Sequence, residues 1–324
     1  MTGGIGAVAG GVSGETATVA LGLASAAIWG TSDFVGGIVA RRLPSSAVVT
    51  LSHSLSLVLL VSLALIHKSA WPDTRSVVYG ALAGVACGTG VMVLYKALAL
   101  GGMGLTAAVS GVLAAVLPVL WAFSTEGLPR VPQLAGIVLA AVAIWMIARA
   151  PGSPSSKQAI LLGAAAGASF GFLFILLKLA GRGGVLWPLA WSRLASATLA
   201  AIVTWIGTRR IGTRRIGAGR IGAGRIGTPV GAKVDAKLDA RPKLLWPGWA
   251  VLGLIAIAGI FDASGNTFYT IATRLGRLDI AAVLSSLYPA STILLAAVLL
   301  KERTTRSQAA GMALALAAVV LISV

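Results

Sequence analysis

Apolar residues gather along this chain into runs of about twenty, and short polar connections separate the runs. An α-helix rises about 1.5 Å per residue, so about twenty residues cross the roughly 30 Å hydrocarbon core of a membrane. The pattern therefore predicts an all-α integral membrane protein with ten transmembrane helices. Their expected ranges are Val19–Ala40, Ala47–Leu65, Val78–Leu100, Leu105–Ser124, Gln133–Arg149, Ala159–Leu179, Trp187–Ile206, Trp249–Ala272, Asp279–Leu300 and Ser307–Val324.

The composition excludes a soluble globular protein. Of the 324 residues, 57% are hydrophobic and only 11% are charged, which is too few polar residues to cover a surface in water. The net charge of +17 would suggest nucleic acid as a partner of a soluble protein. Here, however, ten of the 26 basic residues fall between Arg209 and Lys243, within one connection. We therefore expect the lipid bilayer, and no nucleic acid, as a partner of this chain.

The two halves of the sequence repeat each other. Leu21 and Leu162 begin matching Leu-Gly pairs at an offset of 141 residues (162 − 21), and Gln133 matches Gln308 at an offset of 175 (308 − 133). The difference of 34 residues (175 − 141) predicts an insertion in the second half. Five helices in each half place the halves in opposite orientations, and such inverted repeats are typical of transporters.

We divide the chain into an N-terminal tail (1–18), a first five-helix repeat (19–150), a linker (151–158) and a second repeat (159–324). The second repeat carries a basic, low-complexity insertion at about 208–245, which we expect to be a loop. The tail has no basic residue, so it lacks the charged start of a signal peptide.

The basic residues of the connections bear on the orientation of the chain in the membrane. The connections on the side opposite the termini carry 17 Lys and Arg residues, and those on the side of the termini carry seven. Because the more basic side usually faces the cytoplasm, this count would put the termini outside. Without the insertion, both sides carry seven.

Several short motifs stand in both halves. In the second half they are Ile260-Phe261-Asp262, Leu284-Ser285-Ser286-Leu287-Tyr288-Pro289 and Lys301-Glu302-Arg303. In the first half they are Trp29-Gly30-Thr31-Ser32-Asp33-Phe34, Tyr95-Lys96-Ala97-Leu98 and Glu126. Together they resemble the EamA-type proteins of the drug/metabolite transporter (DMT) superfamily over nearly the whole chain, apart from the tail and the insertion. One departure is Glu126-Gly127, where the family usually has Glu followed by Arg.

The resemblance implies a secondary transporter that exports or exchanges small organic metabolites or drugs by alternating access, with both termini in the cytoplasm. We expect a multi-pass protein of a bacterial plasma membrane that is not an enzyme and uses no cofactor. The single cysteine and two histidines exclude a multi-histidine or thiolate metal centre. Proton coupling and assembly as a homodimer stay open. Two alternatives also stay open: an intramembrane enzyme that modifies lipids or sugars, and a membrane subunit that does not transport.

Three charged residues, Asp33, Arg193 and Asp262, fall near the middle of predicted helices. A charge at the centre of a transmembrane helix costs about 2.5–3.5 kcal/mol on insertion scales, so these residues are candidates for substrate binding or coupling. Either carboxylate can accept a cationic substrate or a proton, and either can instead neutralise Arg193. Arg193 can also bind an anionic group through its planar guanidinium.

Polar and aromatic residues extend two of these positions along their helices. Asn266 and Tyr269 lie one and two turns after Asp262, and Trp29 lies one turn before Asp33. A water-filled cavity would explain such stripes, and so would hydrogen bonds between helices. We therefore include Trp29, Asn266 and Tyr269 among the candidate site residues.

The remaining candidates are aromatic, titratable or helix-breaking. Trp191 precedes Arg193 on the same predicted helix, and His53 stands next to the position that the repeat aligns with Arg193 (193 − 141 = 52). Histidine titrates near neutral pH, so His53 can relay protons or simply be hydrogen-bonded. Pro118 and Pro289 lie inside the fourth and ninth predicted helices, which they should kink. Corresponding interruptions in two halves point to a transport site.

Overall fold

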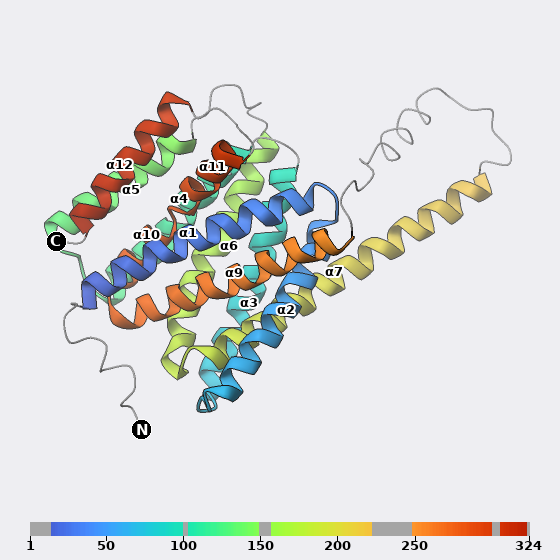
Figure 1. Cartoon of the computed structure of the whole chain (residues 1–324), viewed down its shortest axis with the longest axis horizontal. Coiled ribbons are helices and arrows are strands. Elements are labelled where there is room, and N and C mark those ends of the chain that lie inside the picture. Colours follow the sequence, from blue (N-terminus) through green and yellow to red (C-terminus); the bar gives the residue numbers. More distant parts are fainter. Residues whose placement is uncertain (1–13, 100–102, 149–156, 222–247, 300–304, 323–324) are drawn as a thin grey trace.

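The computed structural model describes residues 14–99, 103–148, 157–221, 248–299 and 305–322, and these ranges contain helices and no strand. The helices form one bundle (Figure 1). They are α1 (Gly14–Ala40), α2 (Ser45–Ile66), α3 (Thr74–Ala99), α4 (Met103–Thr125), α5 (Val131–Ala148), α6 (Lys157–Ala180), the 3₁₀ turn η1 (Gly181–Gly183), α7 (Leu186–Ile221), α9 (Gly248–Leu275), α10 (Leu278–Ser285), α11 (Tyr288–Leu299) and α12 (Arg306–Ile322).

Seven segments of the described chain are long and apolar enough to cross a membrane. They are α1, α2, α3, α6, α7, α9 and the stretch Leu278–Leu295, which joins α10 to most of α11. Large apolar side chains also lie exposed on the outside of the bundle, among them Val58, Leu120 and Leu252. In water such exposure would be unfavourable, whereas lipid tails accept it. These features are those of a multi-pass integral membrane protein.

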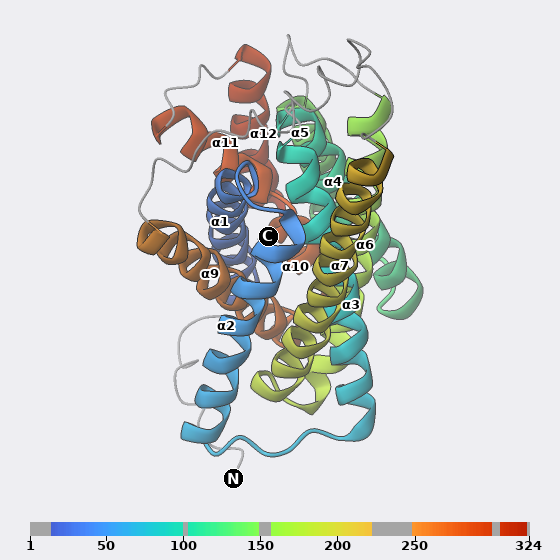
Figure 2. The same cartoon turned by 90° about the vertical axis from the view of Figure 1, so that its right-hand side faces the viewer.

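Helices from the two halves of the sequence pack against each other. α1 lies along α9, and α6 lies along α3. α2 contacts α7, and α5 lies beside α12 at one edge of the bundle (Figure 1). Figure 2 shows α1 and α9 on one side of the bundle and α3, α6 and α7 on the other. The core of the protein therefore lies between helices that are far apart in sequence.

Glycines let α3 approach α7 closely. A Cβ atom at Gly88 would lie 2.6 Å from Oγ of Ser196, and one at Gly84 would collide with the backbone of Ser192. Any larger side chain at these positions would push the two helices apart. The close approach matters for function because both helices contribute side chains to the centre of the bundle.

Two helix ends differ most from the sequence prediction. α1 begins at Gly14, inside the predicted tail. α7 continues to Ile221, although a loop was predicted from residue 208, so that prediction is wrong for residues 208–221 (Figure 1). The extension contains alanine, arginine and isoleucine, which tolerate a helix, and proline is absent until Pro229. The rest of the insertion lies outside the described residues.

The two prolines of interest affect their helices differently. The predicted ninth helix is divided into α10 and α11, with the break at Ser286 and Leu287, directly before Tyr288 and Pro289. A proline has no N–H group to donate and its ring crowds the preceding turn, which accounts for a break at this place. α4 instead runs through Pro118 without interruption.

Candidate functional site

An ion pair between α7 and α9 lies at the centre of the bundle. Nη1 of Arg193 lies 2.7 Å from Oδ2 of Asp262, and the Arg193 side chain is fully buried. Two opposite charges stabilise each other strongly in a medium of low polarity, whereas either one alone would be costly there. Two carboxylates were alternatives for the neutralisation of Arg193, and the structure pairs it with Asp262.

His53 of α2 and Cys87 of α3 surround this ion pair. Nε2 of His53 lies 3.2 Å from Oδ2 of Asp262, and its Nδ1 lies 2.5 Å from Oγ of Ser196. Nη1 of Arg193 donates to Sγ of Cys87 at 3.3 Å. A neutral imidazole satisfies this geometry, since Nε2–H donates to the carboxylate and Nδ1 accepts from the Ser196 hydroxyl. Four helices are thus linked by one polar network.

Asn266 completes the network from within α9. Its amide nitrogen donates to the backbone oxygen of Asp262 at 2.6 Å and to Oδ1 of the same residue at 3.2 Å. The predicted polar stripe along this helix therefore consists, at these two positions, of residues that bond to each other. Oxygen and nitrogen atoms without a hydrogen bond remain on this network: Nε and Nη2 of Arg193 and Oδ1 of Asn266.

The same network contains three potential metal ligands. The side chains of His53, Cys87 and Asp262 bring their ligand atoms within 4.8 Å of one another. However, the guanidinium of Arg193 lies among them, 2.7 Å from Asp262 and 3.3 Å from Cys87. Because a fixed cation already occupies the space between these ligands, a metal ion would have to displace it. The geometry fits an arginine-centred network better than a metal centre.

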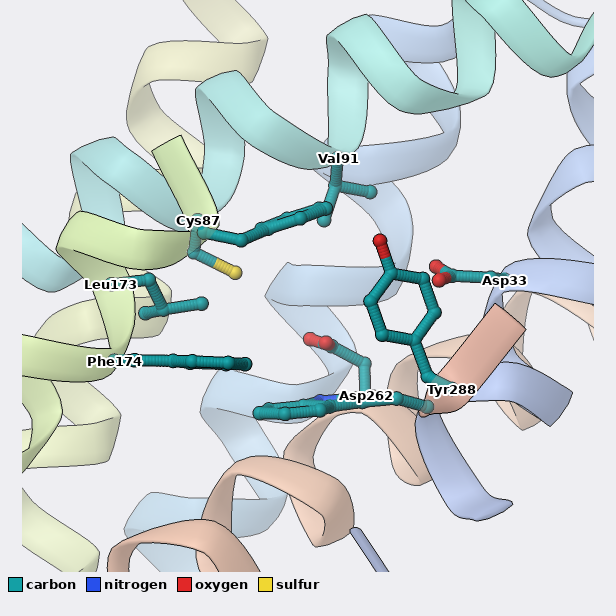
Figure 3. Close-up of a pocket in the computed structure, with 9 residues that line it drawn as sticks. Asp33, Cys87, Val91, Leu173, Phe174, Asp262 and Tyr288 are labelled. Atoms are coloured by element: carbon teal, nitrogen blue, oxygen red, sulfur yellow. The ribbon is translucent and has the colours of Figure 1, made fainter. Parts of the chain in front are cut away.

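A small cavity of about 30 Å³ adjoins the network. Side chains from α1, α3, α6, α9 and α11 point into it (Figure 3). We call it the central cavity, and it is lined by Trp29, Asp33, Cys87, Val91, Phe170, Leu173, Phe174, Asp262 and Tyr288. A mostly apolar wall with a few polar groups is typical of sites for small molecules.

Asp33 reaches the central cavity from α1, on the opposite side from Cys87 and Leu173 (Figure 3). Among the described residues it has neither an ion pair nor a hydrogen bond through its side chain. An unpaired carboxylate within a transmembrane helix is unfavourable by about 2.5–3.5 kcal/mol on insertion scales, and such residues usually face a water-filled space or a ligand. Asp33 therefore differs from Asp262, whose charge is already matched.

Aromatic rings form one wall of the central cavity. The rings of Trp29 and Phe174 are stacked, with their centroids 5.3 Å apart and their planes at 9°. Phe174 also stacks with Tyr269, at a centroid distance of 4.5 Å. Across the cavity, Tyr288 meets Phe170 edge to face at 6.3 Å, and its hydroxyl donates to Oγ of Ser110 at 2.9 Å. These contacts fix the rings and leave their faces and edges toward the cavity.

The structure brings most of the predicted site residues together. Trp29, Asp33 and Asp262 line the central cavity, while His53, Arg193, Asn266 and Tyr269 are buried directly behind it. Trp191 does not join them, because it lies edge to face with Trp71, 6.3 Å away, in a cluster with Trp187 at the start of α7. The lining residues that the sequence did not single out are Cys87, Val91, Phe170, Leu173, Phe174 and Tyr288.

A second group of charges, which we call the Glu126 cluster, joins the ends of α4 and α6 to the start of α10. The Glu126 carboxylate pairs with the ammonium of Lys178 and accepts a hydrogen bond from the backbone N–H of Leu278 at 3.1 Å. Arg277 pairs with Asp279 at 2.8 Å and donates to the backbone oxygen of Glu126 at 3.2 Å. The cluster holds these helix ends together on one side of the bundle.

Comparisons with known proteins agree with this architecture. Among solved structures, one of 28 matching chains is a crystal structure with a TM-score of 0.68 and 16% sequence identity, and the match covers 95% of this chain and 98% of that one. At this identity the likeness concerns the fold alone. No curated protein matches the sequence. The sequence profile of the EamA-like transporter family, however, matches residues 157–324, which is more than half of the chain. The chain therefore belongs to the EamA-like transporter family.

Proposed function

We propose that this protein is a secondary transporter that moves small organic metabolites or drugs across the membrane by alternating access, as an exporter or exchanger. The observation that carries the proposal is the central cavity, which lies inside a bundle of membrane helices and holds two carboxylates. Its walls come from α1 and α3 of the first half and from α6, α9 and α11 of the second. Membership of a transporter family agrees with this role.

We infer that the bundle consists of two inverted five-helix repeats. The pairing of helices supports this inference: if α1 is exchanged with α6 and α3 with α9, the contact of α1 with α9 becomes the contact of α6 with α3, and both are present. The same relation exchanges α2 with α7 and α5 with α12, and the two helices of each of these pairs are in contact with each other. Alternating access in such proteins is a movement of one repeat against the other around a site between them.

The Glu126 cluster supports a closed state on one side of the bundle. It ties Glu126 after α4 and Lys178 of α6 to the backbone at the start of α10. In a transport cycle these contacts would separate when the central cavity opens toward that side. Water would then hydrate their partly exposed charges, which limits the free-energy cost of separating them.

Coupling to protons is the part of the proposal that depends on the carboxylates. Either Asp33 or Asp262 can carry a proton in one half of the cycle and release it in the other. Asp33 is the better candidate, because protonation of Asp262 would leave Arg193 as an uncompensated buried charge.

Transport in reconstituted vesicles tests the proposal. The purified protein is placed in liposomes that contain a pH-sensitive dye, a pH gradient is imposed, and phenylalanine, glucose, uridine and tyramine are added one at a time. We expect at least one compound to cross faster than in protein-free liposomes and to move protons with it. Asp33→Asn should abolish the proton movement, and Asp73→Asn, which alters a carboxylate outside the helices, should not.

Two results separate the parts of this proposal. If none of the compounds crosses faster than in protein-free liposomes, the transport proposal is contradicted. If a compound crosses at a rate that depends neither on the pH gradient nor on Asp33, proton coupling is wrong while transport stands. Size-exclusion chromatography of each variant shows whether it is folded before either result is used.

A further inference from the structure

We propose that the central cavity binds a small organic cation, an amine attached to an apolar or aromatic group, and that Asp33 is its counter-ion. This inference deepens the proposed function, on which it rests, by assigning a chemical class to the substrate. It also separates the roles of two carboxylates that the sequence left equivalent.

The charges around the central cavity favour a cation over an anion. None of its nine lining residues is basic, and two of them, Asp33 and Asp262, are acidic. The nearest buried guanidinium, that of Arg193, is fully covered and already lies 2.7 Å from Asp262. Among the described residues, an anionic substrate would therefore meet carboxylates and no free cation in the cavity wall, whereas an ammonium group would meet the unpaired Asp33.

The aromatic wall fits the rest of such a molecule. Trp29 and Phe174 present a stacked pair of rings, and Tyr288 lies beside the Asp33 carboxylate (Figure 3). A cation near the face of an indole or phenol ring is attracted by the ring quadrupole, and the attraction is stronger away from water. The apolar part of the ligand would then contact Val91 and Leu173.

The size of the central cavity limits the ligand. Its volume of about 30 Å³ has room for about two water molecules in this state, so a ligand can enter only if the walls move apart. A single ring with a short amine chain requires a smaller movement of the walls than a drug with several fused rings. Phenethylammonium is therefore a suitable probe.

Calorimetric titration of the full chain in lipid nanodiscs tests the inference with three probes of nearly equal shape. Phenethylammonium carries a positive charge, 2-phenylethanol carries none, and 3-phenylpropionate carries a negative charge. We expect phenethylammonium to bind at least about tenfold more tightly than the other two, because only it can pair with Asp33. Equal binding of all three, tighter binding of the anion, or no binding of phenethylammonium would overturn the inference.

Variants identify the group that recognises the charge. Asp33→Asn should bring the affinity for phenethylammonium down to that for 2-phenylethanol, while Asp33→Glu should keep most of the preference. Asp73→Asn is the control, and it should bind all three probes as the wild type does. Unchanged binding of 2-phenylethanol by Asp33→Asn shows that the central cavity is intact. A charge preference that survives in Asp33→Asn would overturn the role of Asp33.

The inferred cation site and the proposed transport function can be contradicted separately. Binding that is selective for the cation and depends on Asp33, without movement of phenethylammonium into liposomes, would support the site and contradict transport. Transport of a neutral or anionic compound with no preference for cations would support the proposed function and overturn this inference.

Discussion

Asp262 and Asp33 are the same kind of residue on the wall of the same cavity, yet their surroundings differ. Asp262 lies 2.7 Å from Arg193 and 3.2 Å from His53, and Asn266 donates to it. Asp33 has no such partner among the described residues. A carboxylate that is matched by fixed groups serves mainly to hold helices together, whereas an unmatched one is available to a ligand or a proton.

The largest effect is expected on the Asp262 side. Arg193→Ala removes the cation and leaves a buried carboxylate without its counter-ion, which should destabilise the protein by about 3–5 kcal/mol. Chemical unfolding of the purified protein, followed by helix content, measures this loss. Replacing both partners, Arg193→Met with Asp262→Leu, should restore much of the stability. A loss below about 1 kcal/mol in the single variant would show that the ion pair is not structural.

The next effect tests how the network is positioned. Gly84→Ala should destabilise the protein by about 1–3 kcal/mol, because the added Cβ would meet the backbone of Ser192 and push α3 away from α7. Gly253→Ala is the matched control on α9, since a Cβ there meets no atom within 4 Å. The same unfolding measurement applies. Equal stability of the two variants would mean that α3 and α7 do not need their close approach.

A small effect on stability is expected on the Asp33 side. Asp33→Asn replaces a carboxyl group that has no partner among the described residues, so the free energy of unfolding should stay within about 1 kcal/mol of the wild type or rise slightly. Asp262→Asn should be clearly less stable, because it leaves Arg193 without its counter-ion. The two variants are compared by unfolding under the same conditions. A large loss of stability in Asp33→Asn would show that Asp33 has a structural partner and would remove the contrast.

The smallest effect concerns an exposed carboxylate, which serves as a reference for the two at the cavity. Oδ1 of Asp73 accepts a hydrogen bond from the backbone N–H of Ser76 at the start of α3. Hydrogen bonding to Ser76 lowers the pKa of Asp73 below its ordinary 3.8. A lowered pKa in the folded state means that this contribution is complete above about pH 4 and disappears as the pH falls through the folded-state pKa.

Asp73→Asn should therefore lose a little stability at pH 7 and match the wild type at low pH. Unfolding curves recorded from pH 7 down to pH 3 measure the difference between the two proteins. A difference that grows as the pH falls would have the wrong sign for this explanation.

Each predicted range overlaps a described helix or, for the ninth, two, and seven described segments are long and apolar enough to cross a membrane. The pattern of apolar runs did not predict the helix boundary correctly where the composition is compatible with either a helix or a loop. The Arg-Ile-Gly copies after Ile206 can form a helix or a loop, and α7 continues through them to Ile221. The break between α10 and α11 lies before Pro289, as its chemistry suggests, but Pro118 is accommodated within α4.

The charged residues of the site could be found from sequence because charge is rare in membrane helices. The aromatic residues could not. Phe170, Phe174 and Tyr288 stand in apolar helices where a ring facing lipid and a ring facing a cavity look the same in sequence. The pairing of Arg193 with Asp262 rather than Asp33 likewise depends on how α7 and α9 are rotated, which no local pattern specifies.

The single cysteine of the chain can show directly whether the cavity between the two halves is a transport path. Cys87 lines the central cavity. In oriented liposomes, a membrane-impermeant trimethylammonium methanethiosulfonate is added to one side or to the other, and modification of Cys87 is followed by mass spectrometry. We expect modification from both sides, slowed by phenethylammonium. Modification from one side only, or from neither, would contradict it.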